Sequence, residues 1–237
     1  MRIRLLDYVA GARAASGVAV IIDVLRACSV ACYAMAAGAE RIVPVADAGE
    51  ALRLRDAAAD RLAIGERHGR KLPGFDFGNS PTELAGADLR GRTLIHTTHA
   101  GTQGLTAARG ADCVLTGALV NAAALCRHIA QLAPSEVSLV RMGVAAQARS
   151  EADDLCAELL AARLEGGRCA DRDEIRRRLR RSPEAQKFFD PQASWAPEQD
   201  FAACIELDRF DFVLQLERGN ATDAGTEPAY LKRVDVP

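Results

Sequence analysis

Short runs of apolar, β-branched residues alternate with helical segments along the first two thirds of the chain, and this alternation constrains the fold most. The run at residues 18–23 precedes a small-residue helical stretch at 27–37, and the run at 41–45 precedes a helical stretch at 48–59. Strands that are apolar throughout are typical of parallel sheets covered by helices on both faces. The pattern predicts a three-layer α/β/α fold with a mixed, mostly parallel sheet.

The same alternation continues toward the C-terminus. Further strands are expected at 61–64, 93–97, 113–116, 137–140, 212–216 and 231–236, and further helices at 100–108, 120–131, 150–164 and 171–181. No internal repeat, low-complexity linker or composition break divides the chain. We therefore expect one α/β domain that spans residues 1–237.

Composition excludes several classes of protein. Of the 237 residues 49% are hydrophobic, which argues against disorder, and 30 basic against 32 acidic residues argue against nucleic-acid and membrane-surface partners. Seven cysteines, with no C-x-x-C pair, suggest free thiols. The N-terminus lacks a charged leader with an apolar core, and no apolar run is long enough to cross a membrane, so a cytoplasmic location is expected. An exposed sheet edge or helix face could support a homodimer.

Polar residues gather directly after the expected strands. They are Asp23, Arg26 and Ser29, then Glu66 and Arg67, then residues 97–102, then Asn121, and finally Asp153 with Asp154. Parallel sheets bind ligands at the carboxyl ends of their strands, beside helix N-termini that favour anions. The sequence therefore predicts a site for a small anionic molecule at this edge of the sheet.

One connection is too long for an ordinary loop. Residues 65–81 read GERHGRKLPGFDFGNSP, and long loops in compact domains tend to be functional. Within it, Arg67-His68-Gly69 has the form by which histidine phosphatases present a nucleophilic imidazole, although here it follows a late strand. An exposed loop histidine is the other interpretation.

Other motifs also have two interpretations each. Residues 97–102 (TTHAGT) suit an anion at a helix entry but also an ordinary helix cap, and His96 and His99 could be metal ligands or structural residues. Ser150 and Asp153 have the spacing of a capping box, while Asp153 and Asp154 could also approach a divalent cation. The arginines at 172–181 follow acidic residues, which favours a solvated helix over an RNA-binding stripe. Standard nucleotide-binding and cysteine-phosphatase motifs are absent.

Taken in order, these segments resemble the 2-phosphosulfolactate phosphatase (ComB-like) family. The resembling segments are residues 23–29 (DVLRACS), 65–69 (GERHG), 74–81 (GFDFGNSP), 97–102 (TTHAGT), 117–121 (GALVN) and 153–157 (DDLCA), with a weaker echo at 200–208. Departures are Ala100 where the family usually has Asn, Asp153 where it has Glu, and Arg141-Met142-Gly143 where it often has Cys-Ala-Gly.

The resemblance implies a magnesium-dependent phosphatase that hydrolyses a small anionic phosphoester, such as (2R)-2-phospho-3-sulfolactate, in coenzyme M biosynthesis. Carboxylates are the ligands that Mg2+ prefers, and arginines and hydroxyls suit the anionic groups. The residues expected to act in catalysis are Asp23, Arg26, Glu66 and Asp76; those expected to bind substrate are Arg67, Asn79, Ser80, Thr98, Gly101, Thr102 and Asn121; and the metal ligands are expected among Asp23, Glu66, Asp76 and Asp154. A protein that binds a phosphorylated metabolite without hydrolysing it is the alternative.

Overall fold

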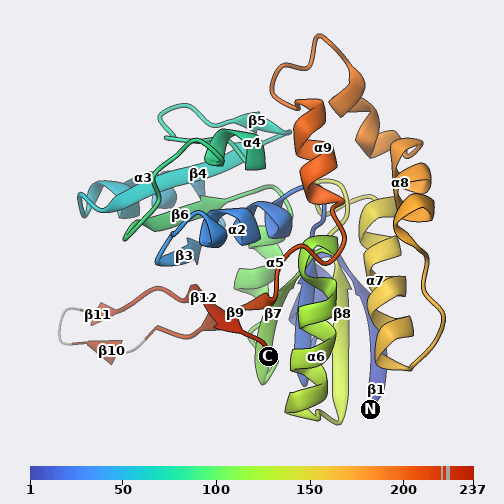
Figure 1. Ribbon diagram of the computed structural model, residues 1–237. Helices are drawn as coiled ribbons and strands as arrows, with labels where there is room; N and C mark the ends of the chain where they lie inside the picture. The colour runs from blue at the N-terminus through green and yellow to red at the C-terminus, as the bar shows by residue number, and fades with distance from the viewer. Residues whose placement is uncertain (220, 223–224) are drawn as a thin grey trace.

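The computed structural model describes residues 1–219, 221–222 and 225–237. Its main sheet has the strand order β1-β8-β2-β7-β9-β12-β3-β6-β4-β5 (Figure 1). The strands are β1 (Arg2–Asp7), β2 (Val18–Ile22), β3 (Arg41–Pro44), β4 (Arg61–Arg67), β5 (Arg70–Lys71), β6 (Thr93–Thr97), β7 (Cys113–Gly117), β8 (Glu136–Arg141), β9 (Phe212–Glu217) and β12 (Tyr230–Asp235). Two short strands, β10 (Ala221–Thr222) and β11 (Gly225–Thr226), pair separately.

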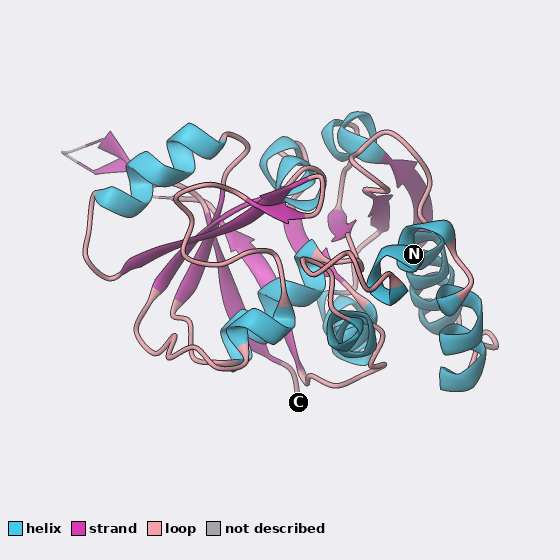
Figure 2. Cartoon of the chain, turned by 90° about the horizontal axis from the view of Figure 1, so that it is seen from above, coloured by secondary structure: helices cyan, strands magenta, loops and turns pink. Residues whose placement is uncertain are grey.

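The helices connect these strands in the expected alternation. They are α1 (Tyr8–Arg13), α2 (Ala27–Ala36), α3 (Ala48–Asp56), α4 (Pro81–Leu84), α5 (Gly101–Ala107), α6 (Ala122–Leu132), α7 (Glu151–Leu164), α8 (Arg172–Arg180) and α9 (Glu198–Cys204), with 3-10 segments η1 (Leu119–Asn121) and η2 (Pro183–Phe189). Seen from above, helices lie on both sides of the strands (Figure 2). The predicted three-layer α/β/α fold with a mixed, mostly parallel sheet is confirmed.

The sheet consists of two parallel groups joined by an antiparallel pair. Strands β1, β8, β2 and β7 are parallel to one another, as are β3, β6 and β4. Between them, β9 and β12 pair antiparallel, with one bridge from Leu115 of β7 to Gln215 and one from Leu231 to Ile42 of β3. Because all seven parallel strands point the same way within their groups, their carboxyl ends present loops and helix N-termini along one edge of each group.

Alternating side chains of β2 show how the layers are built. Val18, Val20 and Ile22 pack with α6 and α7, whereas Ala19 and Ile21 pack with α1, α2 and α5. All five residues are fully or almost fully buried. A strand buried on both faces explains why its sequence is continuously apolar rather than alternating.

Some element boundaries differ from the sequence prediction. The helix expected at 48–59 ends at Asp56, and the strand expected at 61–64 continues to Arg67. β1, α1 and α9 are not among the elements predicted from the sequence. β1 is an edge strand that mixes charged and apolar residues, and the two helices are six and seven residues long, so none has a clear periodic signal.

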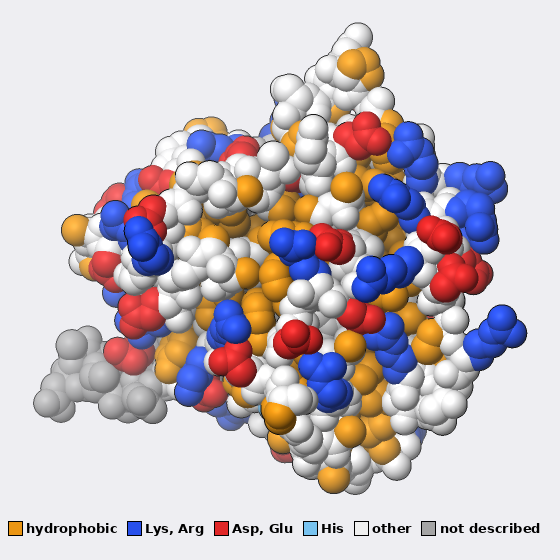
Figure 3. Space-filling model, in the orientation of Figure 1, with side chains coloured by type: hydrophobic (Ala, Val, Ile, Leu, Met, Phe, Trp, Pro, Cys, Tyr) orange, Lys and Arg blue, Asp and Glu red, His pale blue; other side chains and the backbone are white. Residues whose placement is uncertain are grey.

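The charged surface of α8 and the state of the cysteines are as expected from the sequence. Arg178 of α8 pairs with Glu151 and Glu158, and Arg180 pairs with Glu198, as expected for a solvated helix. On the face shown in Figure 3, basic side chains over α8 lie beside acidic ones. All seven cysteines are free. In the described residues no helix has the length and hydropathy needed to cross a membrane.

Candidate active site

A cavity of about 360 Å³ opens at the carboxyl ends of β2, β4, β6 and β8. Its lining residues are Asp23, Leu25, Arg26, Glu66, His68, Gly69, Asn79, His99, Ala100, Gly143, Val144, Ala145, Ser150, Asp153, Pro183, Glu184, Lys187 and Trp195. We call the carboxylates Asp23, Glu66 and Asp153 the strand-end floor, and residues 183–200 the C-terminal wall. The cavity lies where the strand-end polar residues predicted an anion site.

Asp23 directly follows β2 and accepts two backbone hydrogen bonds. The Ala27 N–H donates to Oδ1 at 3.1 Å, and the Gly101 N–H at the start of α5 donates to Oδ2 at 2.8 Å. A Cβ at Gly101 would lie 2.6 Å from the Ala27 Cβ and 2.8 Å from Asp23 Oδ2, so this close approach requires glycine. Burial raises the pKa of Asp23 from 3.8 to about 6, with the Ala27 hydrogen bond opposing the shift and the charge of Glu66 adding to it.

Asp153, in the first turn of α7, is the second buried carboxylate of the floor. Its Oδ1 accepts from the Val24 N–H at 2.9 Å and its Oδ2 from the Gly143 N–H at 2.8 Å. Burial, and then the charge of Asp23, raise the pKa of Asp153 well above its ordinary value. The capping box is thus half formed: Ser150 Oγ accepts from the Asp153 N–H, but the Asp153 carboxylate bonds to two loops outside the helix.

Glu66 connects the loops that follow β4 and β6. Its Oε1 accepts from the His99 N–H at 2.8 Å and its Oε2 from the Gly69 N–H at 2.6 Å. The rings of His68 and His99 pack edge to face, with centroids 4.7 Å apart, on the cavity lining. His99 Nδ1 is buried and has no hydrogen-bond partner among the described residues.

Arg26 reaches the cavity from the N-terminus of α2 and is held by the C-terminal wall. Its guanidinium forms an ion pair with Asp200 of α9 and donates to the Gly69 carbonyl oxygen at 3.1 Å. Both ion-pair side chains are buried, at 2% and 0% exposure. Asp200 Oδ1 also accepts from Ser80 Oγ at 2.8 Å and from the Thr82 N–H at 3.0 Å. Asp200 therefore fixes both the arginine and the start of α4.

Of the uncharged residues expected to donate hydrogen bonds to the substrate, one lines the cavity and the others lie behind its lining. Asn79 lines the cavity, and its Oδ1 lies 3.1 Å from Nε2 of His96. Burial lowers the pKa of His96 to about 3, so the neutral ring can donate to that oxygen. Ser80, Thr98, Gly101 and Thr102 lie just behind the lining, where Thr98 and Thr102 exchange hydrogen bonds between side chain and backbone at the start of α5.

Four further predicted site residues also lie outside the cavity lining, and other side chains or backbone groups hold them there. Asp76 Oδ2 accepts from the Ala63 N–H at 2.7 Å and faces Arg55, and Asp154 pairs with Arg141 and Arg149. Arg67 donates to the Glu66 and Ala46 carbonyl oxygens and to Thr97, and Asn121 Oδ1 accepts from the Ala118 N–H. The structure therefore does not assemble the predicted set Asp23, Glu66, Asp76 and Asp154.

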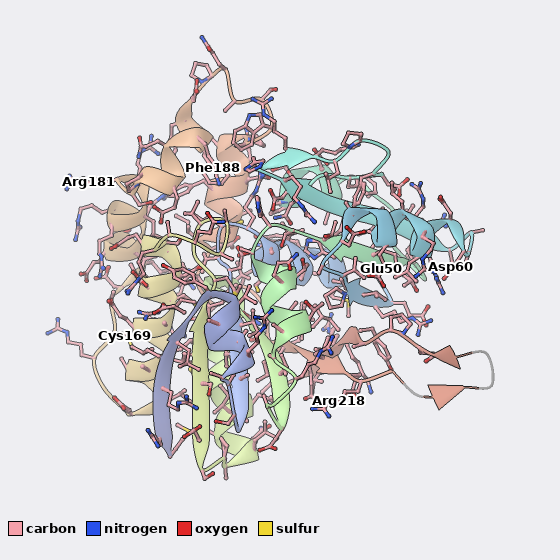
Figure 4. All side chains as sticks on the ribbon, turned by 180° about the vertical axis from the view of Figure 1, so that it is seen from behind. Glu50, Asp60, Cys169, Arg181, Phe188 and Arg218 are labelled. Carbon is pink, nitrogen blue, oxygen red and sulfur yellow. The ribbon has the colours of Figure 1, made fainter. Side chains whose placement is uncertain are left out.

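Several cavity residues lie outside the predicted set. The expected metal ligands include Asp154, but its neighbour Asp153 is the residue that lines the cavity. Lys187, Glu184 and Trp195 come from the C-terminal wall, which carried no motif. Phe188, the neighbour of Lys187, is buried, whereas Arg181 is exposed; both are labelled in the upper part of Figure 4. No periodic signal in residues 183–195 could have identified this inward turn, because η2 is a 3-10 segment.

The donor chemistry of the floor suits a magnesium ion. In the described part of the chain, no group of three or more His, Cys, Asp and Glu side chains is arranged to hold a metal ion. Mg2+, however, is often bound by one or two carboxylates, with water and substrate oxygens completing its octahedron. Asp23 and Asp153 meet this requirement, because each of their oxygens accepts one hydrogen bond and keeps a second lone pair.

Comparison with known proteins gives the family of the chain. The sequence model described as 2-phosphosulpholactate phosphatase matches residues 7–219. A Bacillus subtilis protein named as a probable 2-phosphosulfolactate phosphatase is 33% identical over 204 residues, which cover 84% of this chain and 86% of the relative. A protein of the same name from Prochlorococcus marinus is 34% identical over 217 residues, which cover 82% of this chain and 87% of the relative.

These matches, with the buried acidic cavity at the strand ends, make the protein an enzyme of the phosphoric monoester hydrolase class. The chain belongs to the 2-phosphosulfolactate phosphatase family. The resemblance inferred from the motifs is confirmed, and the match extends beyond residues 23–157 in both directions.

Proposed function

We propose that the protein hydrolyses (2R)-2-phospho-3-sulfolactate to 3-sulfolactate and phosphate in a magnesium-dependent reaction at the cavity on the strand-end floor. The names of the relatives support the substrate. The observation that carries the proposal is the pair of buried carboxylates, Asp23 and Asp153, which line one cavity with Arg26. Perturbed acidic groups in a cleft are typical of catalytic sites.

The residues of the chain divide the work in this reaction. Water adds to phosphorus while the bond between phosphorus and the ester oxygen of the lactate skeleton breaks. The released alkoxide oxygen must therefore gain a proton. Arg26 faces the cavity and, held by Asp200, can orient a phosphate oxygen with charge-assisted hydrogen bonds. The Asn79 amide group, oriented by His96, is a neutral donor on the same lining. A magnesium ion held by Asp23 and Asp153 would neutralise phosphate charge.

A histidine phosphatase mechanism fits this geometry less well. His68 does line the cavity, as that alternative requires. The adjacent Arg67, which would have to clamp the phosphate, instead bonds to Ala46, Glu66 and Thr97 outside the cavity. We therefore expect His68→Ala to lower turnover by no more than a few fold, whereas loss of a nucleophile would abolish it.

Phosphate release from a panel of small phosphoesters tests the proposal. The panel contains 2-phosphosulfolactate, 2-phospholactate and glycerol 2-phosphate, each assayed with Mg2+ and with EDTA. We expect the first compound to be the best substrate and EDTA to abolish its turnover. Turnover that survives complete chelation would contradict the magnesium role, and no turnover on any compound would contradict the substrate assignment.

A further inference from the structure

Lys187 stands out from the other basic residues of the chain. Only three of the 30 basic residues are lysine, namely Lys71, Lys187 and Lys232. Lys71 donates to the Asp76 carbonyl oxygen and Lys232 is exposed on β12, but Lys187 is half-buried and lines the cavity. It projects from η2, so the C-terminal wall places an ammonium group across from the strand-end floor.

The two full cations on the cavity lining differ in their partners. The Arg26 guanidinium is paired with Asp200. Within the ranges that the structure describes, the Lys187 ammonium group has no carboxylate within 4.0 Å and donates no hydrogen bond; its one contact of this kind is with the Phe188 ring, whose centroid lies 5.1 Å away. Burial, and then the charge of Arg26, lower the pKa of Lys187. Both side chains line the cavity, so an anion bound there would relieve their repulsion.

We propose that Lys187 binds the anionic group that a polyanionic substrate carries besides its phosphate, and so determines specificity for such substrates over simple phosphomonoesters. This inference rests on the proposed function, because 2-phosphosulfolactate carries a carboxylate and a sulfonate in addition to phosphate. The floor already supplies three carboxylates, so a substrate with extra negative charge needs a compensating cation on the opposite side of the cavity. An ammonium group is compact and can turn its three donors toward a carboxylate or a sulfonate.

Lys187→Met tests the inference by removing the charge and keeping most of the side-chain volume. Four substrates are compared: 2-phosphosulfolactate, 2-phospholactate with only the carboxylate, phosphoisethionate with only the sulfonate, and glycerol 2-phosphate with neither. We expect the ratio of kcat/KM for 2-phosphosulfolactate over glycerol 2-phosphate to fall about 10- to 100-fold, as for loss of a charged hydrogen bond. The intermediate substrate that shares this loss identifies the group bound. An equal loss on all four substrates would overturn the proposal, since it would mean that Lys187 only neutralises the floor.

Two control variants and a binding assay complete the test. Lys232→Met removes an exposed lysine from β12 and should leave the ratio of kcat/KM between 2-phosphosulfolactate and glycerol 2-phosphate unchanged. Lys187→Arg keeps the positive charge and should retain at least part of the preference for 2-phosphosulfolactate. Thermal unfolding checks that each variant is folded. Isothermal titration calorimetry with 3-sulfolactate, which needs no turnover, should give an affinity about tenfold weaker for Lys187→Met than for the wild type. Equal affinity of the two proteins for 3-sulfolactate would overturn the role of Lys187, and so would a lack of binding by both. The absence of turnover by the wild type would contradict only the proposed function.

Discussion

The strand-end floor and the C-terminal wall are two halves of one cavity built on different principles. In the floor, Asp23, Glu66 and Asp153 each accept two backbone hydrogen bonds from the loops and helix N-termini that follow parallel strands. The wall instead supplies the ammonium group of Lys187, and its Asp200 holds Arg26; its one carboxylate on the lining, Glu184, accepts hydrogen bonds from Ser150 Oγ and the Ala152 N–H. The floor thus suits the reacting phosphate and a cation, and the wall suits recognition of the remaining anionic groups. The following predictions ask whether the two halves can be separated by experiment.

Asp23→Asn should have the largest effect on activity. The variant loses a carboxylate that is proposed to hold Mg2+, and stabilisation of the transition-state charge by a metal ion is worth several kcal/mol. We expect kcat/KM to fall about 1,000-fold on every substrate, including glycerol 2-phosphate. A loss confined to polyanionic substrates would instead assign Asp23 to recognition, and the distinction between floor and wall would fail.

Asp200→Asn should have the largest effect on stability. It leaves the buried Arg26 guanidinium without its carboxylate, and breaking a buried ion pair typically costs about 3–5 kcal/mol. Denaturant unfolding measures this loss. Asp211→Asn is the matched control, because Asp211 is 88% exposed and its pair with Arg127 should contribute less than about 1 kcal/mol. Equal, small losses in both variants would show that the wall does not depend on this ion pair.

Without metal, the free energy of unfolding should depend on pH through Asp23 of the floor, and this effect should be smaller than that of Asp200→Asn. The pKa of Asp23 is raised to about 6 in the folded state, so the folded protein binds this proton more tightly than the unfolded chain. The resulting stabilisation is full below about pH 4 and is lost as the pH rises through about 6. Glu66 and Asp153 face Asp23 with like charge, and Lys187 opposes them.

Denaturant unfolding of the wild type and of Asp23→Asn in EDTA, between pH 4.5 and 7, measures this pH-dependent loss of stability. The stability of the wild type relative to the variant should fall by on the order of 2 kcal/mol across this range. Parallel curves for the two proteins would show that Asp23 titrates normally in the folded state.

The sequence predicted the layers of the fold and much of the floor, for reasons that particular residues make clear. Buried strands such as β2 are continuously apolar, and Asp23 and Glu66 lie where those strands end, so local pattern was sufficient. Asp153 and Asp154 differ only in their position around α7, and one of the two residues that donate to Asp153, Val24, is distant in sequence. Lys187 and Asp200 enter the site only through the tertiary packing of η2 against α8 and α9, and of α9 against α4. Magnesium dependence, a single domain, a homodimer, a cytoplasmic location and a role in coenzyme M biosynthesis stay predictions.

Adjacent substitutions on α7 test the central claim most directly. Asp153 lines the cavity, whereas Asp154 pairs with Arg141 and Arg149 outside it. We therefore compare kcat/KM for 2-phosphosulfolactate between Asp153→Asn and Asp154→Asn, after thermal unfolding has shown that both are folded. We predict a loss of at least about 100-fold for Asp153→Asn and of no more than about threefold for Asp154→Asn. The reverse order, or equal losses, would contradict the assignment of the active site to this cavity.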